Sequence, residues 1–414
     1  MKSFYLKSIL LLTSGSMLGQ IIGFIGSMIM TRLYTTSEIG IMTTIVSISG
    51  IFAPVINARF DFALVKEQKE EYIFALVKMS IYIGVIMSML ISLASYIYFT
   101  GIDGFISPTV SVFFVFLILV IQAFSNVFKS YNNNIGDFKT MTSVIVLRRF
   151  AEEISMAIFG LMGWKAIGLL VSRVIGQYFG MKREIVNIKK FFKPIISVQW
   201  KCVQEAYKIH KRQLYYSAPA ALMNAGSYSL ISLIVGKYFG LEMLGIYAIS
   251  FAVLGLPLSV ISGNVSKVYF SEASKEYAIK GTFNESTNKT LVFLMIIAVV
   301  LFFVMYYLFP ILVPVIYGEK YKMAGFMIRI LAPMFAVRFV SSAINTGLVV
   351  CNKQNFELII QIMFMLSVAL LAFLCNNRLL TISTFLLGVS LTYSIVYLVN
   401  LVSVSYTHLT LPTT

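Results

Sequence analysis

The chain has 414 residues, of which 58% are hydrophobic and only 12% are charged. Soluble domains carry about a quarter charged residues, so this composition excludes an ordinary soluble protein and indicates a polytopic membrane protein. The formal net charge of +16 would suit a nucleic-acid-binding protein. Most of the basic residues, however, lie in loops between apolar runs, where they set membrane orientation, so no nucleic-acid partner is expected.

Apolar runs of about 20 residues recur along the chain, the length that a helix needs to cross a hydrocarbon core of about 30 Å. We predict an all-α integral membrane protein of about twelve transmembrane helices. The weakest division is within 141–181, because a single long helix there would leave eleven spans. The twelve predicted spans are 8–30, 39–58, 75–99, 109–131, 141–160, 165–181, 214–235, 244–266, 290–312, 324–350, 356–375 and 380–402.

The loop charges predict the topology. Lys and Arg gather in alternate loops, and the positive-inside rule then places the amino terminus and both chain ends in the cytoplasm. The first apolar run is too long for the apolar region of a signal peptide, so it is interpreted as the first span of a multi-pass protein.

The longest predicted segment between spans divides the chain into two lobes. An N-terminal lobe of six helices occupies 1–181, a basic linker 182–213, and a C-terminal lobe of six helices 214–402. From 182 to 216 the chain has nine basic and two acidic residues interleaved with aromatic and aliphatic ones. Two interpretations stay open: a linker that fixes topology, or a partly amphipathic helix on anionic lipid.

The two lobes show a weak internal repeat. "TRLYTTSEIGI" (31–41) matches "GKYFGLEMLGI" (236–246) at an offset of 205 and pairs Gly40 with Gly245. Many transporters consist of two such halves with a binding site between them. The last residues, 403–414, lack the expected basic residues, and we interpret them as a non-native tail.

Four charged residues interrupt the fifth span: Arg148, Arg149, Glu152 and Glu153. Charges at this depth are costly and usually face a bundle interior or a wet cavity. The i,i+4 spacing of Arg148 with Glu152 and of Arg149 with Glu153 allows self-neutralisation. The alternative is the polar wall of a central cavity, in which Glu152 or Glu153 takes up a proton and couples transport to an ion.

Two further arginines lie near the middle of predicted spans, Arg173 in the sixth and Arg338 in the tenth. Each needs an anion, either a carboxylate on another helix or a phosphate of a ligand. At the predicted inner end of span two, Arg59 and Asp61 are candidates for a cytoplasmic gate.

Motifs that the sequence lacks reduce the number of functions to consider. The three cysteines lie far apart and predict neither a disulfide framework nor a metal site. The sequence has no nucleotide-binding motif, and its non-membrane segments are too short for a catalytic domain. We therefore expect a protein that is not an enzyme and binds no cofactor or metal.

Three stretches together resemble a known family: "TRLYTTSEIGI", "RFDFALVKEQKEE" (59–71) and "YSAPAALMNAGSYSLISLIVGKYFGLEMLGIYAIS" (216–250). They are similar to the Wzx-type flippases of the polysaccharide biosynthesis protein family, in the multidrug/oligosaccharidyl-lipid/polysaccharide exporter superfamily. The likeness extends to about residue 400. By motif, it covers Arg59 and Asp61 but none of the deeper arginines.

The resemblance implies a two-lobed bundle with a V-shaped cavity that moves an undecaprenyl-diphosphate-linked sugar repeat unit to the outer leaflet. It also implies a cationic lumen for the diphosphate and a proton or sodium gradient as energy source. Arg148, Arg149, Arg173 and Arg338 suit this substrate, because guanidinium groups pair well with phosphate. The polysaccharide polymerase and the chain-length machinery are candidate partners. The first span lacks the arginines typical of lipid II flippases, which argues against a peptidoglycan precursor.

The main alternative is a cation-coupled multidrug antiporter of the same superfamily. Such a protein would be expected to have more carboxylates than arginines in its cavity, whereas the predicted spans hold more Arg than Glu away from their ends. A membrane-embedded polymerase or ligase would need a large outer loop, and none is predicted. A purely structural scaffold would not need arginines at mid-depth.

Overall fold

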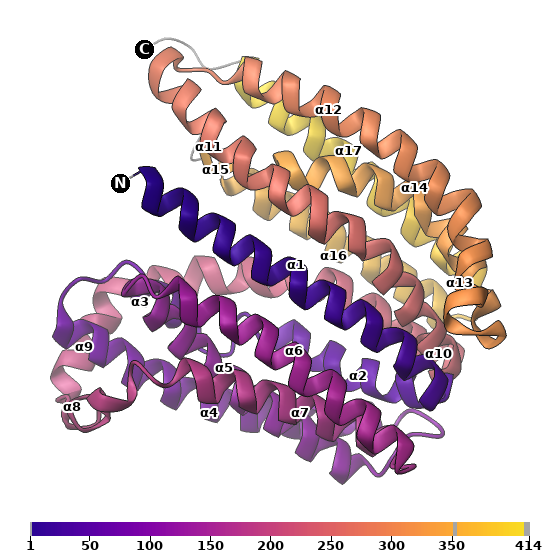
Figure 1. Cartoon of the computed structure of the whole chain (residues 1–414), viewed down its shortest axis with the longest axis horizontal. Helices are drawn as coiled ribbons and strands as arrows, with labels where there is room; N and C mark the ends of the chain where they lie inside the picture. Colours follow the sequence, from indigo (N-terminus) through magenta and orange to yellow (C-terminus); the bar gives the residue numbers. More distant parts are fainter. Residues whose placement is uncertain (1, 351–353, 410–414) are drawn as a thin grey trace. The chain divides into compact units, whose positions relative to one another are not determined.

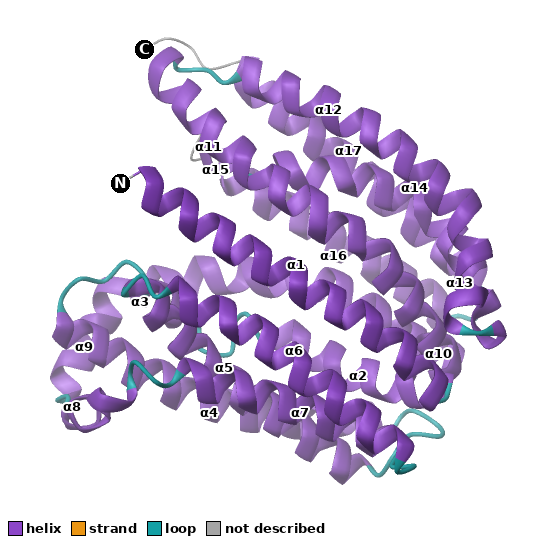
Figure 2. Cartoon of the chain, viewed as in Figure 1, coloured by secondary structure: helices purple, strands orange, loops and turns teal. Residues whose placement is uncertain are grey.

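The computed structural model describes residues 2–350 and 354–409, and this part of the chain forms helices and turns with no strand (Figures 1 and 2). It divides into two compact units, residues 1–245 and 246–414. The predicted lobe boundaries at 181 and 214 stay a prediction. Residues 410–414 of the predicted non-native tail lie outside the described residues.

Six long helices of the first unit correspond to the first six predicted spans. Helix α3 (Phe60–Leu64) lies between two of them, after α2. Helices α8 (Phe192–Ser197) and α9 (Trp200–His210) follow the last of them, α7. Helix α6 packs against both α1 and α7. The long helices are α1 (Lys2–Leu33), α2 (Thr36–Phe52), α4 (Glu70–Phe99), α5 (Pro108–Asn134), α6 (Phe138–Leu161) and α7 (Lys165–Glu184).

The division between the fifth and sixth spans is confirmed. Helix α6 ends at Leu161 and α7 begins at Lys165. Gly163 takes a left-handed conformation with φ 73°, which glycine adopts without a steric penalty. The prediction of about twelve spans is therefore confirmed over the alternative of eleven.

The second span differs from its prediction, because α2 ends at Phe52 and not at 58. Residues 53–59 form turns within the bundle. Asn126 of α5 donates from Nδ2 to the Ala53 carbonyl at 2.9 Å, and Asn57 donates to the Ser80 carbonyl at 2.9 Å. The Asn126 amide thus satisfies a backbone carbonyl that a continued α2 would have satisfied itself, and the Asn57 amide ties the turn segment to α4. Hydropathy does not reveal either contact.

Spans seven and eight meet at one residue. Helix α10 (Ala218–Pro257) is interrupted at Gly240, whose φ of 89° and ψ of 164° are not helical. The sequence predicted a loop of several residues between these spans. Because glycine accepts this conformation readily, a single residue separates the two helical segments and no loop is needed.

The two repeat segments cross each other closely within the first unit. A β-carbon on Gly40 would overlap the backbone oxygen of Leu241, and one on Gly245 would overlap that of Thr36. Residues 40 and 245, like 36 and 241, are separated by the repeat offset of 205, so the contact is reciprocal. Both positions therefore require glycine, because the two backbones lie too close together for a side chain.

The second unit contains the rest of α10 and the remaining helices. Helix α14 packs against α12, α13 and α17, and its Phe335 and Phe339 are fully buried. Helices α12 and α13 together form the ninth span. The helices that follow α10 are α11 (Gly263–Lys280), α12 (Asn284–Phe303), α13 (Phe309–Tyr317), α14 (Lys322–Ile344), α15 (Gly347–Val350), α16 (Gln354–Asn376) and α17 (Ile382–Leu409).

Eight helical stretches of the described residues are long and apolar enough to cross a membrane, by length and composition alone. One of these stretches runs from Gln213 to Lys280 and contains the break at Gly240, so it holds two spans. Helix α2 is too short for this criterion, and α6 and α7 carry the charged residues of the candidate site. The charged residues of α6 and α7 therefore make these two helices less apolar than the eight stretches.

Candidate functional site

Helix α6 presents Arg149 and Glu153 to α1. A β-carbon on Gly23 of α1 would lie 3.4 Å from the Arg149 guanidinium carbon, and one on Gly26 would overlap the Glu153 carboxyl group. Glycines in α1 thus leave space for charged side chains between two helices. This close packing of small residues is common between membrane helices.

The other two charged residues of α6 face α7. A β-carbon on Gly176 would lie 2.6 Å from Cβ of Glu152, and one on Gly180 would lie 3.4 Å from Cβ of Arg148. Residues four apart share one face of a helix, whereas adjacent residues do not. The sequence Arg-Arg-x-x-Glu-Glu therefore gives one Arg and one Glu to each neighbouring helix.

With Arg173 of α7, the cluster contains three arginines and two glutamates. Ion pairs join only some of these side chains. Arg173 of α7 places Nη1 2.5 Å from Oε1 of Glu152, and these side chains are 22% and 12% exposed. Arg149 places Nη1 3.6 Å from Oε1 of Glu153 and 4.0 Å from Oε2 of Glu152. Arg148 lies along the same interface, against Gly180. The cluster therefore has one more positive than negative group.

The structure supplies one of the two anions proposed for Arg173. Its partner in the structure is a carboxylate on another helix, the Glu152 side chain. The i,i+4 pairing of Arg149 with Glu153 occurs as expected. For Glu152, the short contact comes from Arg173, 21 positions along the chain, and not from Arg148 as the spacing on α6 suggested.

The cluster also has unmet hydrogen-bonding capacity. Oε2 of Glu152, Nε of Arg173 and Oε1 of Gln177 are buried and have no hydrogen-bond partner among the described residues. Buried polar atoms without partners are rare in proteins, and each calls for an explanation such as a ligand, a water or a functional role. The three atoms comprise one donor and two acceptors, so this interface keeps hydrogen-bonding groups that a ligand or a change of partners could use.

Arg338 lies in the second unit, on α14. Its guanidinium carbon is 5.7 Å from the Phe251 ring centroid and 5.4 Å from that of Phe335. These distances allow cation–π attraction. Arg338 borders a cavity of about 360 Å³ whose lining contains no acidic residue but includes four serines: Ser259, Ser262, Ser266 and Ser342. The cavity therefore suits an anion better than a cation.

The predicted gate residues occupy an irregular segment. Arg59 has a left-handed φ of 64°, donates from Nε to Oγ of Ser217 at 3.3 Å, and lies 4.5 Å from the Phe62 ring centroid. Asp61 is buried, and its Oδ1 has no hydrogen-bond partner among the described residues. Burial raises the pKa of Asp61 above its usual range. Arg59, at the N-cap of α3, thus joins the beginning of that helix to the beginning of the seventh span.

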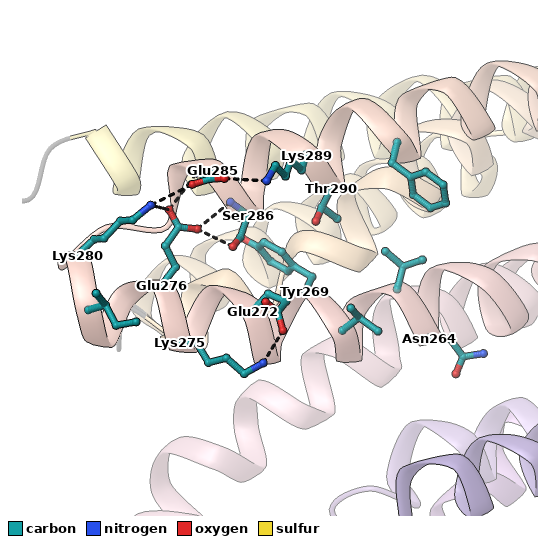
Figure 3. Close-up of a pocket in the computed structure, with 14 residues that line it drawn as sticks. Asn264, Tyr269, Glu272, Lys275, Glu276, Lys280, Glu285, Ser286, Lys289 and Thr290 are labelled. Atoms are coloured by element: carbon teal, nitrogen blue, oxygen red, sulfur yellow. Dashed lines mark hydrogen bonds and ion pairs between the residues drawn. The ribbon is translucent and has the colours of Figure 1, made fainter. Parts of the chain in front are cut away.

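Sequence reasoning missed a second charged region, between α11 and α12. The cavity there has a volume of about 780 Å³. Along it, Lys280 contacts Glu276 and Glu285, and Lys289 contacts Glu285 (Figure 3). Three lysines and three glutamates line it, so their charges cancel. The i,i+3 and i,i+4 spacing of these residues was a signal that could have indicated it. Its neutrality makes it a poorer anion site than the arginine clusters.

Comparison with known proteins identifies the family. A model of the polysaccharide biosynthesis protein family matches residues 29–325. The chain belongs to this family. Comparison with curated protein sequences gives no significant match.

Solved structures show the same fold. The lipid II flippase MurJ, in an inward closed conformation, is similar with a TM-score of 0.71 and 14% identity, covering 97% of this chain and 88% of MurJ. An inward-facing MATE multidrug resistance transporter of the MOP superfamily gives 0.67 and 12%, covering 95% and 94%. A MOP-superfamily transporter from Pyrococcus furiosus, described with a binding pocket of reverse polarity, gives 0.61 and 12%, covering 99% and 97%.

These findings confirm the predicted fold class, an all-α multi-pass membrane protein of about twelve helices in two lobes. The similar structures are transporters and flippases and not enzymes. At such low identity they establish the fold, while the roles of individual residues in this chain stay predictions.

Proposed function

We propose that the protein is a flippase for undecaprenyl-diphosphate-linked oligosaccharide repeat units. It moves them from the inner to the outer leaflet of the bacterial cytoplasmic membrane for assembly of O-antigen, capsule or exopolysaccharide. Membership of the polysaccharide biosynthesis family and the fold shared with a lipid II flippase support this proposal. The loop charges favour an amino terminus in the cytoplasm.

The observation that carries the proposal is the excess of arginine at both candidate sites. The α6–α7 cluster has three arginines and two glutamates, and the residues that line the Arg338 cavity include no carboxylate. Guanidinium groups bind phosphate oxygens in a bidentate geometry and keep their charge when buried. A diphosphate is the part of the substrate that needs such groups.

The ion pair of Arg173 and Glu152 suggests how substrate binding is coupled to an ion. Arg173 cannot pair fully with both Glu152 and a diphosphate. When the diphosphate takes Arg173, Glu152 loses its counter-charge and gains affinity for a proton or a sodium ion, and the reverse also holds. A proton or sodium gradient then resets the cycle, with Glu152 and Glu153 as the coupling residues.

A cation-coupled multidrug antiporter is the second candidate, and one observation favours it. Glu153 is 17% exposed at the side chain and has its ion-pair contact with Arg149 at the longer distance of 3.6 Å. It is therefore the carboxylate of the cluster that a cationic substrate would reach most readily. The fold shared with a MATE transporter also fits this alternative.

Transport into proteoliposomes tests both candidates. We expect uptake of a radiolabelled undecaprenyl-diphosphate sugar that depends on a pH or sodium gradient. It should be lost in Arg338→Ala and Arg173→Gln, retained in part in Arg338→Lys, and unchanged in the control Lys275→Ala. Wild-type uptake in Arg338→Ala would remove Arg338 from the site. Efflux of cationic dyes without sugar-lipid uptake would instead favour the antiporter.

A further inference from the structure

The segment between α7 and α10 exposes basic and apolar residues together. From Lys189 to Arg212 it holds seven basic residues and one acidic residue, and all seven basic side chains are exposed. Among its apolar residues, Ile196 is 73% exposed and Trp200 is 59% exposed. A linker surrounded only by water gains nothing from exposing such residues, whereas interfacial membrane elements combine them regularly.

Trp200 lies beside the apolar surface of α4. Its ring centroid is 5.9 Å from that of Tyr82, and α8 and α9 both contact α4 (Figure 1). Tyr82 is the first of a row of exposed side chains three or four residues apart on α4, the spacing of one helix face. This row comprises Tyr82, Ile86, Met89, Leu93 and Ile97. In a membrane this row of side chains faces lipid, and Trp200 continues the apolar surface from α4 onto the linker.

Hydrogen bonds from Lys78 hold this part of the linker against α4. Its Nζ donates to the carbonyl oxygens of Ile196 and Val198, both at 2.8 Å, and lies 5.1 Å from the Trp200 ring centroid. The carbonyls at the end of α8 need such a donor. Ile196 and Trp200 are therefore held at a defined level along α4.

That level coincides with the edge of the hydrocarbon core. Helix α4 has no charged residue from Met79 to Phe99, a stretch of about 31 Å at 1.5 Å per residue. This matches a hydrocarbon thickness of about 30 Å, so Lys78 marks one boundary of the core. Tryptophan is enriched at this boundary because its ring is apolar and its N–H is polar.

We propose that Lys189–Arg212 is a binding surface for anionic phospholipids of the bilayer, with Ile196 and Trp200 inserted in the interface and the neighbouring lysines contacting headgroups. The exposed charge is almost entirely positive, which complements an anionic membrane surface. An acidic protein partner fits less well, because Ile196 and Trp200 continue a lipid-facing surface. The proposal requires a multi-pass protein but not a particular transported substrate.

The chain contains two tryptophans, Trp164 and Trp200, which allows a direct test. In the full-length Trp164→Phe variant, reconstituted in phosphatidylcholine and phosphatidylglycerol vesicles, fluorescence reports on Trp200 alone. We expect stronger quenching by lipids brominated near the headgroup than by lipids brominated near the chain end, and weak quenching by aqueous iodide. Efficient iodide quenching without bromolipid quenching would overturn insertion and leave the surface for a protein partner.

Lipid charge is tested with the same variant. At equal mole fraction and low salt, brominated phosphatidylglycerol should quench Trp200 more than brominated phosphatidylcholine. The preference should disappear when Lys190, Lys193 and Lys201 are changed to Gln. It should persist in a matched control with Gln at Lys237, Lys320 and Lys322, outside the linker. Equal quenching by both lipids would overturn recognition of anionic headgroups.

Trp164 provides an internal reference. The Trp200→Phe variant keeps only Trp164, which lies at the turn between α6 and α7 and is 43% exposed. Its quenching should not respond to the linker substitutions. A parallel change in Trp164 would mean that the lysine variants alter the whole protein, and the proposal would then fail for lack of a local effect.

Discussion

Two charged clusters of this protein use similar side chains and spacing but differ in burial. In the α6–α7 cluster, the i,i+4 pair of Arg149 and Glu153 is 43% and 17% exposed at its side chains, and the pair of Arg173 and Glu152 across the two helices is 22% and 12% exposed. Between α11 and α12, those of Lys289 and Glu285 are 75% and 56% exposed. The comparison shows that i,i+4 spacing alone does not identify a functional charge, because the surroundings decide what the charge costs.

The physical reason is the local dielectric. Exposed pairs gain little, since water already solvates both charges. Buried pairs lose that solvation, so removal of one partner leaves the other uncompensated. The exposed cluster is also neutral, whereas the buried one carries an excess arginine. The cost of keeping a net charge in a membrane makes the α6–α7 cluster the stronger candidate for a functional site.

The largest loss of stability is expected for Glu152→Gln. This change leaves Arg173 without its counter-charge and should lower the free energy of unfolding by about 3–5 kcal/mol. Thermal unfolding in detergent measures the loss. Glu272→Gln, in the exposed cluster, is the matched control and should melt like wild type. Equal melting of the two variants would contradict the distinction between the clusters.

Gly176→Ala should cause the next largest loss of stability. The new β-carbon would lie 2.6 Å from Cβ of Glu152 and 2.8 Å from the Arg148 carbonyl oxygen, so no side-chain rotation relieves it. Separation of α6 from α7 should cost about 1–3 kcal/mol. The control is Gly255→Ala, where the β-carbon would have no neighbour within 4 Å. A stable Gly176→Ala variant with wild-type transport would show that this interface is looser than described.

Asp137, at the turn before α6, represents an intermediate environment. Burial raises its pKa, but hydrogen bonds from Thr140 and Asn187 outweigh this effect and hold the pKa below its usual range. Its stabilisation is therefore present above the unfolded-state pKa of about 3.9 and is lost as pH falls through the folded-state value.

Asp137→Ala should consequently cost about 1 kcal/mol at neutral pH, as expected for loss of a helix N-cap. The difference from wild type should shrink as pH falls below about 4. Melting curves at a series of pH values measure it. A difference that grows on acidification would show that the carboxylate is not stabilised by these hydrogen bonds.

The smallest effect is expected for Glu285→Gln. Its contacts with Lys280 and Lys289 are solvent-exposed, so their loss should not change the melting temperature measurably at physiological ionic strength. Transport should also be unchanged. A clear loss of stability at high salt would indicate that this cluster is less exposed in the membrane than in the structure.

Local patterns in the sequence predicted most of the architecture. Hydropathy predicted about twelve spans, and Gly163 with Trp164 marked the break between α6 and α7, because a left-handed glycine ends a helix. The same reasoning missed the end of α2. Hydropathy cannot register that Asn126 of another helix satisfies the Ala53 carbonyl.

The sequence by itself determined which residues of the candidate site are charged, and the period of 3.6 residues assigned them to faces of α6. Only the tertiary structure decided the partners. Arg173 reaches Glu152 across α7 and α6, and Gly176 lets the two helices approach closely enough for that contact. Such a pairing depends on the distance between helices, which no single-helix pattern contains. The level of Trp200 likewise depends on its contact with α4, because composition predicts affinity for a membrane but not where a linker meets it.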